Sequence, residues 1–137
     1  MAKAGMERWR RTMANKPRNF REYAIWQDAV ALAKDVYAAT EKMPWFEKKG
    51  LCDQLQRAVV SISSNIAEGA GHPTDKDFAH YLDMALGSAY EVETQLIISN
   101  GIGYLSEDVF NVFMEKLQKL EKQITYLISK IRNETTE

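Results

Sequence analysis

The sequence predicts an all-α protein, an up-down-up-down bundle of four antiparallel helices, and three observations support this. Proline and glycine are scarce, three and seven among 137 residues, and no stretch alternates β-branched and polar residues as a strand does. Apolar residues instead recur at steps of three and four in four successive stretches, which is the spacing of one helix face. The connections between these stretches are short, so consecutive helices are expected to run antiparallel.

The first helix is predicted from Phe20 or Arg21 to Lys42. It carries two adjacent apolar stripes, and such a wide apolar face is typical of a bundle helix that also meets another subunit. Met43-Pro44 ends the helix, because a residue before proline avoids the helical conformation. Trp45-Phe46 lies in the connection that follows. We expect this pair to plug the end of the bundle, and stacking on a ligand is the alternative.

The second helix, predicted from Glu47 or Gly50 to Glu68, is the element that the rest of the chain is expected to surround. It carries an apolar stripe and, beside it, a polar stripe at the same helical steps. Short polar side chains suit a crowded helix contact in which every polar atom needs a partner. The glycines of residues 69–73 stop the helix and offer a left-handed cap. The polar stripe consists of Gln54, Arg57, Ser61, Asn65 and Glu68.

The third helix is predicted to begin after Thr74, an N-cap with Asp77 three residues on, and to end near Asn100. A second polar stripe follows its apolar seam, made of Gly87, Ser88, Glu91 and Gln95. A glycine inside a helix costs about 1 kcal/mol relative to alanine. The close approach of another backbone, or room for a neighbouring side chain, would justify that cost at Gly87.

The fourth helix starts at Ser106, a good N-cap followed by two acidic residues. Its apolar seam is the most regular in the chain, and residues 133–137 are expected to fray as a tail. The seam is Val109, Phe113, Leu117, Leu120, Ile124, Leu127 and Ile131. The charged residues of this helix, Glu121 among them, are assigned to a solvated outer face. The predicted four-helix bundle spans residues 20–132.

The two polar stripes are expected to meet. Arg57 of the second helix and Glu91 of the third are predicted to form a buried ion pair. Such a pair adds little net stability, but removing one partner costs about 3–5 kcal/mol. We expect the pair to fix the register of helices or of subunits, within a hydrogen-bond network completed by Ser61, Asn65, Ser88 and Gln95.

Residues 1–19 form a basic N-terminal arm. Residues 1–21 hold seven Lys or Arg against one Glu, a net charge of +6, whereas the other 116 residues hold 11 basic and 18 acidic side chains, a net charge of −7. Cations of the arm would neutralise phosphates while Trp9 stacks on a base. A solvated tail, or an arm lying on the acidic body of a neighbouring subunit, is the alternative. The candidate nucleic-acid-binding residues are Lys3, Arg8, Trp9, Arg10, Arg11, Lys16 and Arg18.

Catalytic and metal chemistry find little support. The single cysteine, Cys52, allows no internal disulfide or zinc site, and we place it in or beside the core. Di-iron bundles need two Glu-x-x-His pairs, but the nearest fragment, Asp77-x-x-His80, occurs once. No enzymatic activity, metal or other cofactor is expected. No apolar run approaches the ~20 residues that cross a bilayer, so we expect a cytoplasmic protein without a membrane partner.

The two polar stripes also carry a family resemblance. The second helix reads Gln54-Leu55-x-Arg57-Ala58-x-x-Ser61-Ile62-x-x-Asn65-Ile66-Ala67-Glu68-Gly69. The third reads Phe78-x-x-x-Leu82-x-x-Ala85-x-Gly87-Ser88-x-x-Glu91-x-x-Thr94-Gln95-Leu96. Together they resemble the signatures of the 23S rRNA intervening sequence proteins, a family of small bacterial four-helix bundles.

The resemblance covers residues 23–131. It implies a left-handed antiparallel bundle that assembles as a ring, typically a homopentamer, and a role near RNA without catalysis. Distant relatives serve as accessory subunits of the reverse transcriptases of diversity-generating retroelements. The motif residues are packing and assembly positions in this interpretation. The basic arm is not part of the family pattern, and five arms on one ring would raise avidity.

The leading hypothesis is therefore a non-enzymatic, ring-forming accessory protein for RNA or ribonucleoprotein. The alternative is a protein-binding adaptor, such as an accessory subunit of a reverse transcriptase, that uses the broad apolar faces of the first and fourth helices.

Overall fold

The computed structural model describes residues 18–136, with side chains described to Glu134, and these residues form four α-helices and no strand. Two short 3-10 turns precede α2 and α3. The elements are η1 (Phe20–Glu22), α2 (Ala24–Thr40), η2 (Trp45–Glu47), α3 (Leu51–Ala70), α4 (Asp75–Gly101) and α5 (Glu107–Thr136).

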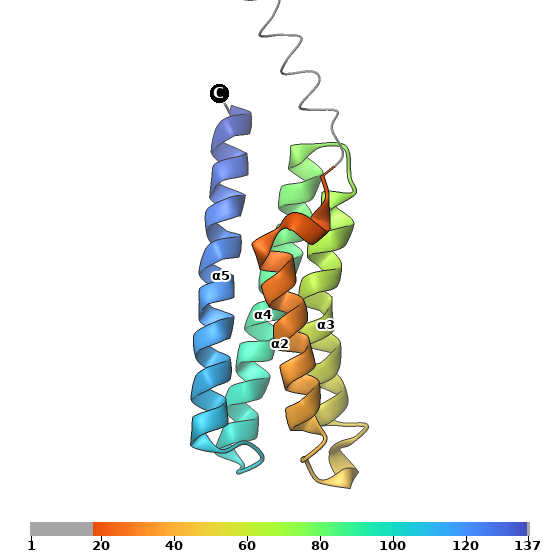
Figure 1. Ribbon diagram of the computed structural model, residues 1–137, viewed down its shortest axis with the longest axis vertical. Helices are drawn as coiled ribbons and strands as arrows, with labels where there is room; N and C mark the ends of the chain where they lie inside the picture. The colour runs from red at the N-terminus through yellow and green to blue at the C-terminus, as the bar shows by residue number, and fades with distance from the viewer. Residues whose placement is uncertain (1–17, 137) are drawn as a thin grey trace, which may run out of the picture.

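The four helices lie side by side and are joined at alternate ends (Figure 1). The α2–α3 and α4–α5 connections lie at one end, and the α3–α4 connection lies at the other. Contact is most extensive between α3 and α4 and least extensive between α2 and α5. The bundle is therefore tightly packed between α3 and α4 and loosely packed between α2 and α5.

The predicted apolar stripes form one core. Their residues lie at helical spacing, so each helix contributes one face, and truncation of such a residue to alanine costs about 2–5 kcal/mol. The largest fully buried side chains are Leu32 and Val36 of α2, Leu55, Val59, Ile62 and Ile66 of α3, Phe78, Leu82 and Leu96 of α4, and Leu117, Leu120 and Ile124 of α5. Cys52 is also buried.

Two of the predicted helix starts are confirmed by side-chain caps. Thr74 Oγ1 accepts a hydrogen bond from the Asp77 amide at 3.1 Å, and Ser106 Oγ accepts one from the Val109 amide at 3.3 Å. Each cap satisfies an amide that has no partner within its helix.

The left-handed cap expected after the second helix is wrong. Gly71 has φ −77°, an ordinary right-handed value, and α3 continues through Gly69 to Ala70. The left-handed glycine lies in the α4–α5 connection instead, where Gly103 has φ +86°. This is the turn at which a side chain would strain the backbone.

The first helix begins later than predicted. Asn19 accepts a hydrogen bond from the Arg21 amide at 3.2 Å and starts the separate turn η1. Tyr23 is extended, with φ −76° and ψ 125°, so α2 starts only at Ala24. At the other terminus α5 extends to Thr136, beyond residue 133, from which fraying was expected.

The expectation that Trp45 and Phe46 plug the bundle is wrong. Their residues are 86% and 61% exposed, and their rings contact each other edge to face at 6.1 Å. Both belong to η2, outside the four packed helices.

Candidate interaction site

The predicted polar contact between the second and third helices exists, but it is smaller than expected. Ser61 of α3 and Ser88 of α4 share a hydrogen bond of 2.9 Å. Asn65 donates to the Ser61 carbonyl at 2.9 Å and to its hydroxyl at 3.0 Å. All three residues are half-buried. This short chain of hydrogen bonds fixes the register of α3 against α4, because shifting either helix would leave the hydroxyls unpaired.

The predicted ion pair between Arg57 and Glu91 is not the one that the structure forms. The Arg57 side chain is 80% exposed and donates to Asp53, four residues earlier on α3, at 3.0 Å. Glu91 is exposed and accepts from Gln95 Nε2 at 3.4 Å. An i,i+4 pair on one helix forms more readily than a contact that must span two helices. Within one chain, these two residues face away from the core.

The other polar residues of the two stripes are also either exposed or buried. Gln54 and Glu68 are exposed. Glu68 accepts from the Tyr81 hydroxyl at 3.4 Å, and its negative charge raises the pKa of Tyr81, with burial and that hydrogen bond adding to the effect. Gln95 is 6% exposed, and its Oε1 has no hydrogen-bond partner in the described part of the chain.

Two glycines of the motifs have opposite environments. A Cβ on Gly69 would lie 2.4 Å from Tyr81 Cβ, so this glycine lets α3 and α4 approach closely. A Cβ on Gly87 would meet nothing within 4 Å. Among the residues that the structure describes, the close approach expected at Gly87 is therefore absent, and the space beside it opens to the surface.

Arg18 holds the start of the described chain against the α3–α4 connection. Its guanidinium donates to the His72 carbonyl at 2.7 Å and forms an ion pair with Asp75. It also lies 4.8 Å from the centroid of the Phe78 ring, and its side chain is 17% exposed. Arg18 is thus an anchor of the body and is removed from the candidate nucleic-acid-binding set. The other six residues of that set lie outside the described residues.

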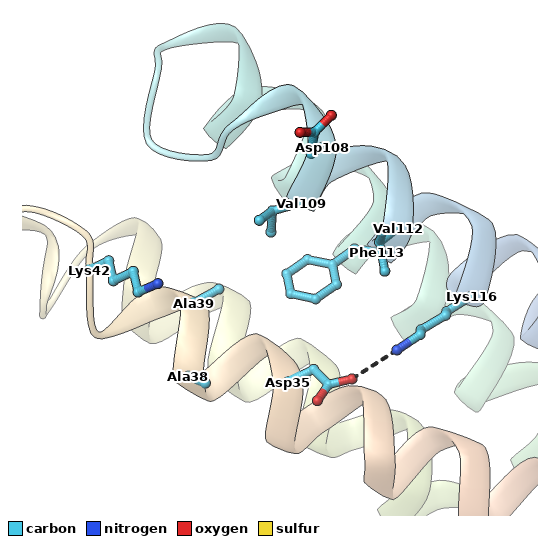
Figure 2. Close-up of a pocket in the computed structure, with 9 residues that line it drawn as sticks. All are labelled: Asp35, Ala38, Ala39, Lys42, Asp108, Val109, Val112, Phe113 and Lys116. Carbon is cyan, nitrogen blue, oxygen red and sulfur yellow. Dashed lines mark hydrogen bonds and ion pairs between the residues drawn. The ribbon is translucent and has the colours of Figure 1, made fainter.

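A groove of about 480 Å³ runs along the loosely closed edge between α2 and α5. Figure 2 shows Val109 and Phe113 of α5 pointing toward α2, with Lys116 reaching Asp35. That ion pair measures 3.1 Å. Val109 was predicted to begin the buried seam, yet it is 38% exposed, and Val112 is 48% exposed. The groove therefore presents apolar side chains to solvent on two helices that the sequence assigned broad apolar faces.

A carboxyl pair between α4 and α5 was missed by the sequence analysis. Glu121, assigned above to a solvated outer face, is 8% exposed. Burial, then the charge of Glu93 and a hydrogen bond to it, raises the pKa of Glu121 to about 7. One signal was available: Glu121 lies four residues after Leu117 and three before Ile124, so it borders the apolar seam.

Within residues 18–136 no group of three or more His, Cys, Asp or Glu side chains has a geometry that holds a metal ion. The described helices also include none that is long and apolar enough to span a membrane.

Comparison with known proteins identifies the family. A family model described as 23S rRNA-intervening sequence protein matches residues 21–126. The fold is similar to a crystal structure from Bacteroides thetaiotaomicron, a protein of unknown function from the S23 ribosomal protein family. The two share 20% identity with a TM-score of 0.71, over 77% of this chain and 98% of that one. A comparison with curated proteins gave no significant match.

Proposed function

Since the chain belongs to the 23S rRNA-intervening sequence protein family, we propose that it is a non-enzymatic accessory factor for RNA or ribonucleoprotein. In this proposal it is a cytoplasmic protein that forms a ring of left-handed, antiparallel bundles, a homopentamer in the family pattern, and its N-terminal arm contacts nucleic acid.

The observation that carries the proposal is the separation of charge along the chain. Residues 1–21 have a net charge of +6 and the remainder has −7. Because the structure uses Arg18 to bind the body, the contacts to RNA fall to Lys3, Arg8, Trp9, Arg10, Arg11 and Lys16. Phosphate neutralisation by such residues supplies most of the affinity in nonspecific binding.

Assembly is supported by the surface of α4. Open space lies beside Gly87, and Met84, Ile97 and Ile98 of the same helix are each between 46% and 52% exposed. Apolar groups exposed along one helix mark a surface that a partner covers. A ring would also present several arms to one RNA, which raises avidity without any stronger single contact.

A salt titration of RNA binding tests the arm. Wild-type protein and the variant R8Q/R10Q/R11Q would bind a labelled single-stranded RNA at increasing salt. Removing three phosphate contacts is expected to weaken binding and to reduce the slope of log K against log salt by about 2, at roughly 0.7 per phosphate. The control K34Q/K48Q/K49Q removes three exposed cations from the body, and it should bind as wild type. Equal loss in both variants, or no binding by the wild type, would overturn the proposal.

A second candidate function, a protein-binding adaptor, is favoured by the α2–α5 groove. A reverse transcriptase is the partner that the family resemblance suggests. The half-exposed Val109 and Val112 would supply an apolar contact there. If the gene lies beside a reverse transcriptase gene, co-expression should yield a salt-resistant complex that V112D abolishes. The matched control is N111D, which adds the same charge at an exposed neighbouring position.

A further inference from the structure

The α4–α5 carboxyl pair has an unsatisfied acceptor. Glu121 is more than nine-tenths buried, and its Oε2 atom has no hydrogen-bond partner among residues 18–134. Glu93 of α4 lies against it, close enough for a hydrogen bond when one of the two carboxyl groups carries a proton. Two ionised carboxylates cannot donate to each other, so the pair is incomplete without a proton or a cation.

No cation of the described residues completes it. The ion pairs found among residues 18–134 join Arg18 to Asp75, Arg57 to Asp53, Lys116 to Asp35 and Arg132 to Asp83. Lys122 lines the same groove, but it belongs to none of these pairs. When neither carboxyl group carries a proton, the charge that balances the pair must therefore come from outside the described residues.

The surroundings of the pair suit a guanidinium or ammonium group. Glu93 and Glu121 line a groove of about 490 Å³ together with Tyr90 and Tyr126, whose residues are 51% and 70% exposed. Carboxylates bind a guanidinium through charge-assisted hydrogen bonds, and tyrosine rings attract cations through their faces. A divalent metal is less suited, because Ca²⁺ and Mg²⁺ take at least about six oxygen ligands.

We propose that this groove is a binding site for an arginine side chain of the basic segment Arg8–Arg11 of the arm. Charge complementarity supports this occupant: residues 8–11 hold three arginines and no acidic side chain, and the groove holds two carboxylates.

Chain length permits the contact. Arg18 is bound at Asp75 in the first turn of α4, and Glu93 lies 18 residues further along that helix, a distance of about 27 Å at 1.5 Å per residue. The ten residues from Arg8 to Arg18 span up to about 33–36 Å when extended. An extended arm is therefore long enough to reach the groove of its own chain.

This site goes beyond the proposed function and does not depend on it. If the arm also binds RNA, the groove and the RNA compete for the same arginines, and the carboxylates act as an internal phosphate mimic. The test below contains no RNA, so its failure and the failure of RNA binding are separate results.

Trypsin digestion of the full chain provides the test. Cleavage after Arg8, Arg10 and Arg11 would be followed by mass spectrometry at pH 8 in wild type and in E93Q/E121Q. A bound segment is cleaved only in the fraction of time that it is released. For a segment bound about 90% of the time, the variant should be cleaved roughly tenfold faster. The control E41Q/E115Q removes two exposed carboxylates from α5 and the end of α2 and should be cleaved at the wild-type rate.

A second measurement removes the dependence on a groove variant. The Glu121 carboxyl would be followed by NMR in wild type and in R8Q/R10Q/R11Q. A seated guanidinium stabilises the carboxylate, so the pKa of Glu121 should be higher in the arginine variant than in wild type. It should stay at the wild-type value in K34Q/K48Q/K49Q.

Equal cleavage rates together with an unchanged Glu121 pKa would overturn the proposal. A change in oligomeric mass of E93Q/E121Q without faster cleavage of the arm would also overturn it, by assigning the groove to the body of another copy.

Discussion

The α3–α4 side of the bundle and the α5 side both combine apolar and polar residues, but they differ in how closely the helices pack and in whether the polar atoms are paired. Between α3 and α4, Gly69 admits Tyr81 closely, and Ser61 and Ser88 satisfy each other. Around α5, the edge toward α2 holds an open groove, and the edge toward α4 holds Glu121, whose Oε2 atom has no hydrogen-bond partner among the described residues. Polar residues on the first side therefore fix the register of two helices, whereas those on the second side remain able to bind a further group.

The largest expected effect comes from closing the space at Gly69. G69A places a Cβ 2.4 Å from Tyr81 Cβ, and since both atoms are attached to helix backbone, α3 and α4 must separate. Overpacking of this kind costs about 1–3 kcal/mol. Urea denaturation would measure the loss.

Gly87 provides the matched control for that variant. G87A meets open space and gains helix propensity, so it should stabilise an isolated chain by up to about 1 kcal/mol. Equal destabilisation by both variants would contradict the distinction between the two glycines.

The next largest effect depends on pH and concerns Glu121. Its pKa in the fold is about 7, raised from 4.5, so folding favours the protonated form. Below pH 4.5 Glu121 is protonated in both the folded and the unfolded state, so its raised pKa does not reduce the free energy of unfolding. The free energy of unfolding decreases as the pH rises from 4.5 through 7. The groups that face it are Glu93 and Tyr90 of α4 and Lys122 and Tyr126 of α5.

E121Q should therefore be more stable than wild type at pH 8, by up to about 3 kcal/mol, and nearly equal to it at pH 4. Thermal or urea unfolding across this range would measure the difference. A constant difference between the two proteins at all pH values would contradict it. A seated arginine would reduce the gain at pH 8, and R8Q/R10Q/R11Q would restore it.

A smaller effect is expected for the serine pair. S61A should cost about 1 kcal/mol, because the Ser88 hydroxyl and Asn65 amide lose a partner. The double variant S61A/S88A should cost less than the two single variants summed. Strict additivity in urea unfolding would show that the two hydroxyls do not act together.

The smallest effect is expected for the exposed pair on α3. R57A should change the stability of one chain by at most about 0.5 kcal/mol, since surface i,i+4 pairs contribute little. A much larger loss that appears only at concentrations where the protein is oligomeric would show that Arg57 is buried by a neighbouring copy. Sedimentation measured beside unfolding would distinguish the two results.

Much of the fold follows from the sequence because helix periodicity is a local signal. The spacing of Leu55, Ile62 and Ile66 on α3 already defines the buried face, and Thr74 and Ser106 mark helix starts through contacts within one turn. Helix ends were less predictable: α2 begins at Ala24 because Asn19 and Tyr23 form a separate turn.

The partners of side chains were harder to predict, because they depend on which helices become neighbours. Arg57 pairs with Asp53 on its own helix and not with Glu91 of α4. The proximity of Glu121 to Glu93 depends on how α4 and α5 pack together, and the spacing along α5 shows only that Glu121 borders the seam. Trp45 and Phe46 look apolar enough for a core, but η2 lies beyond the ends of the helices.

The contacts of Arg18 make the two ends of the bundle different from each other. Arg18 binds at the α3–α4 connection, and Figure 1 shows the end of α5 at that same end of the bundle, opposite the α2–α3 connection that carries Trp45 and Phe46. The two ends of the described chain therefore lie at the same end of the bundle. A fluorescent label at Trp45 would report from the opposite end, away from both.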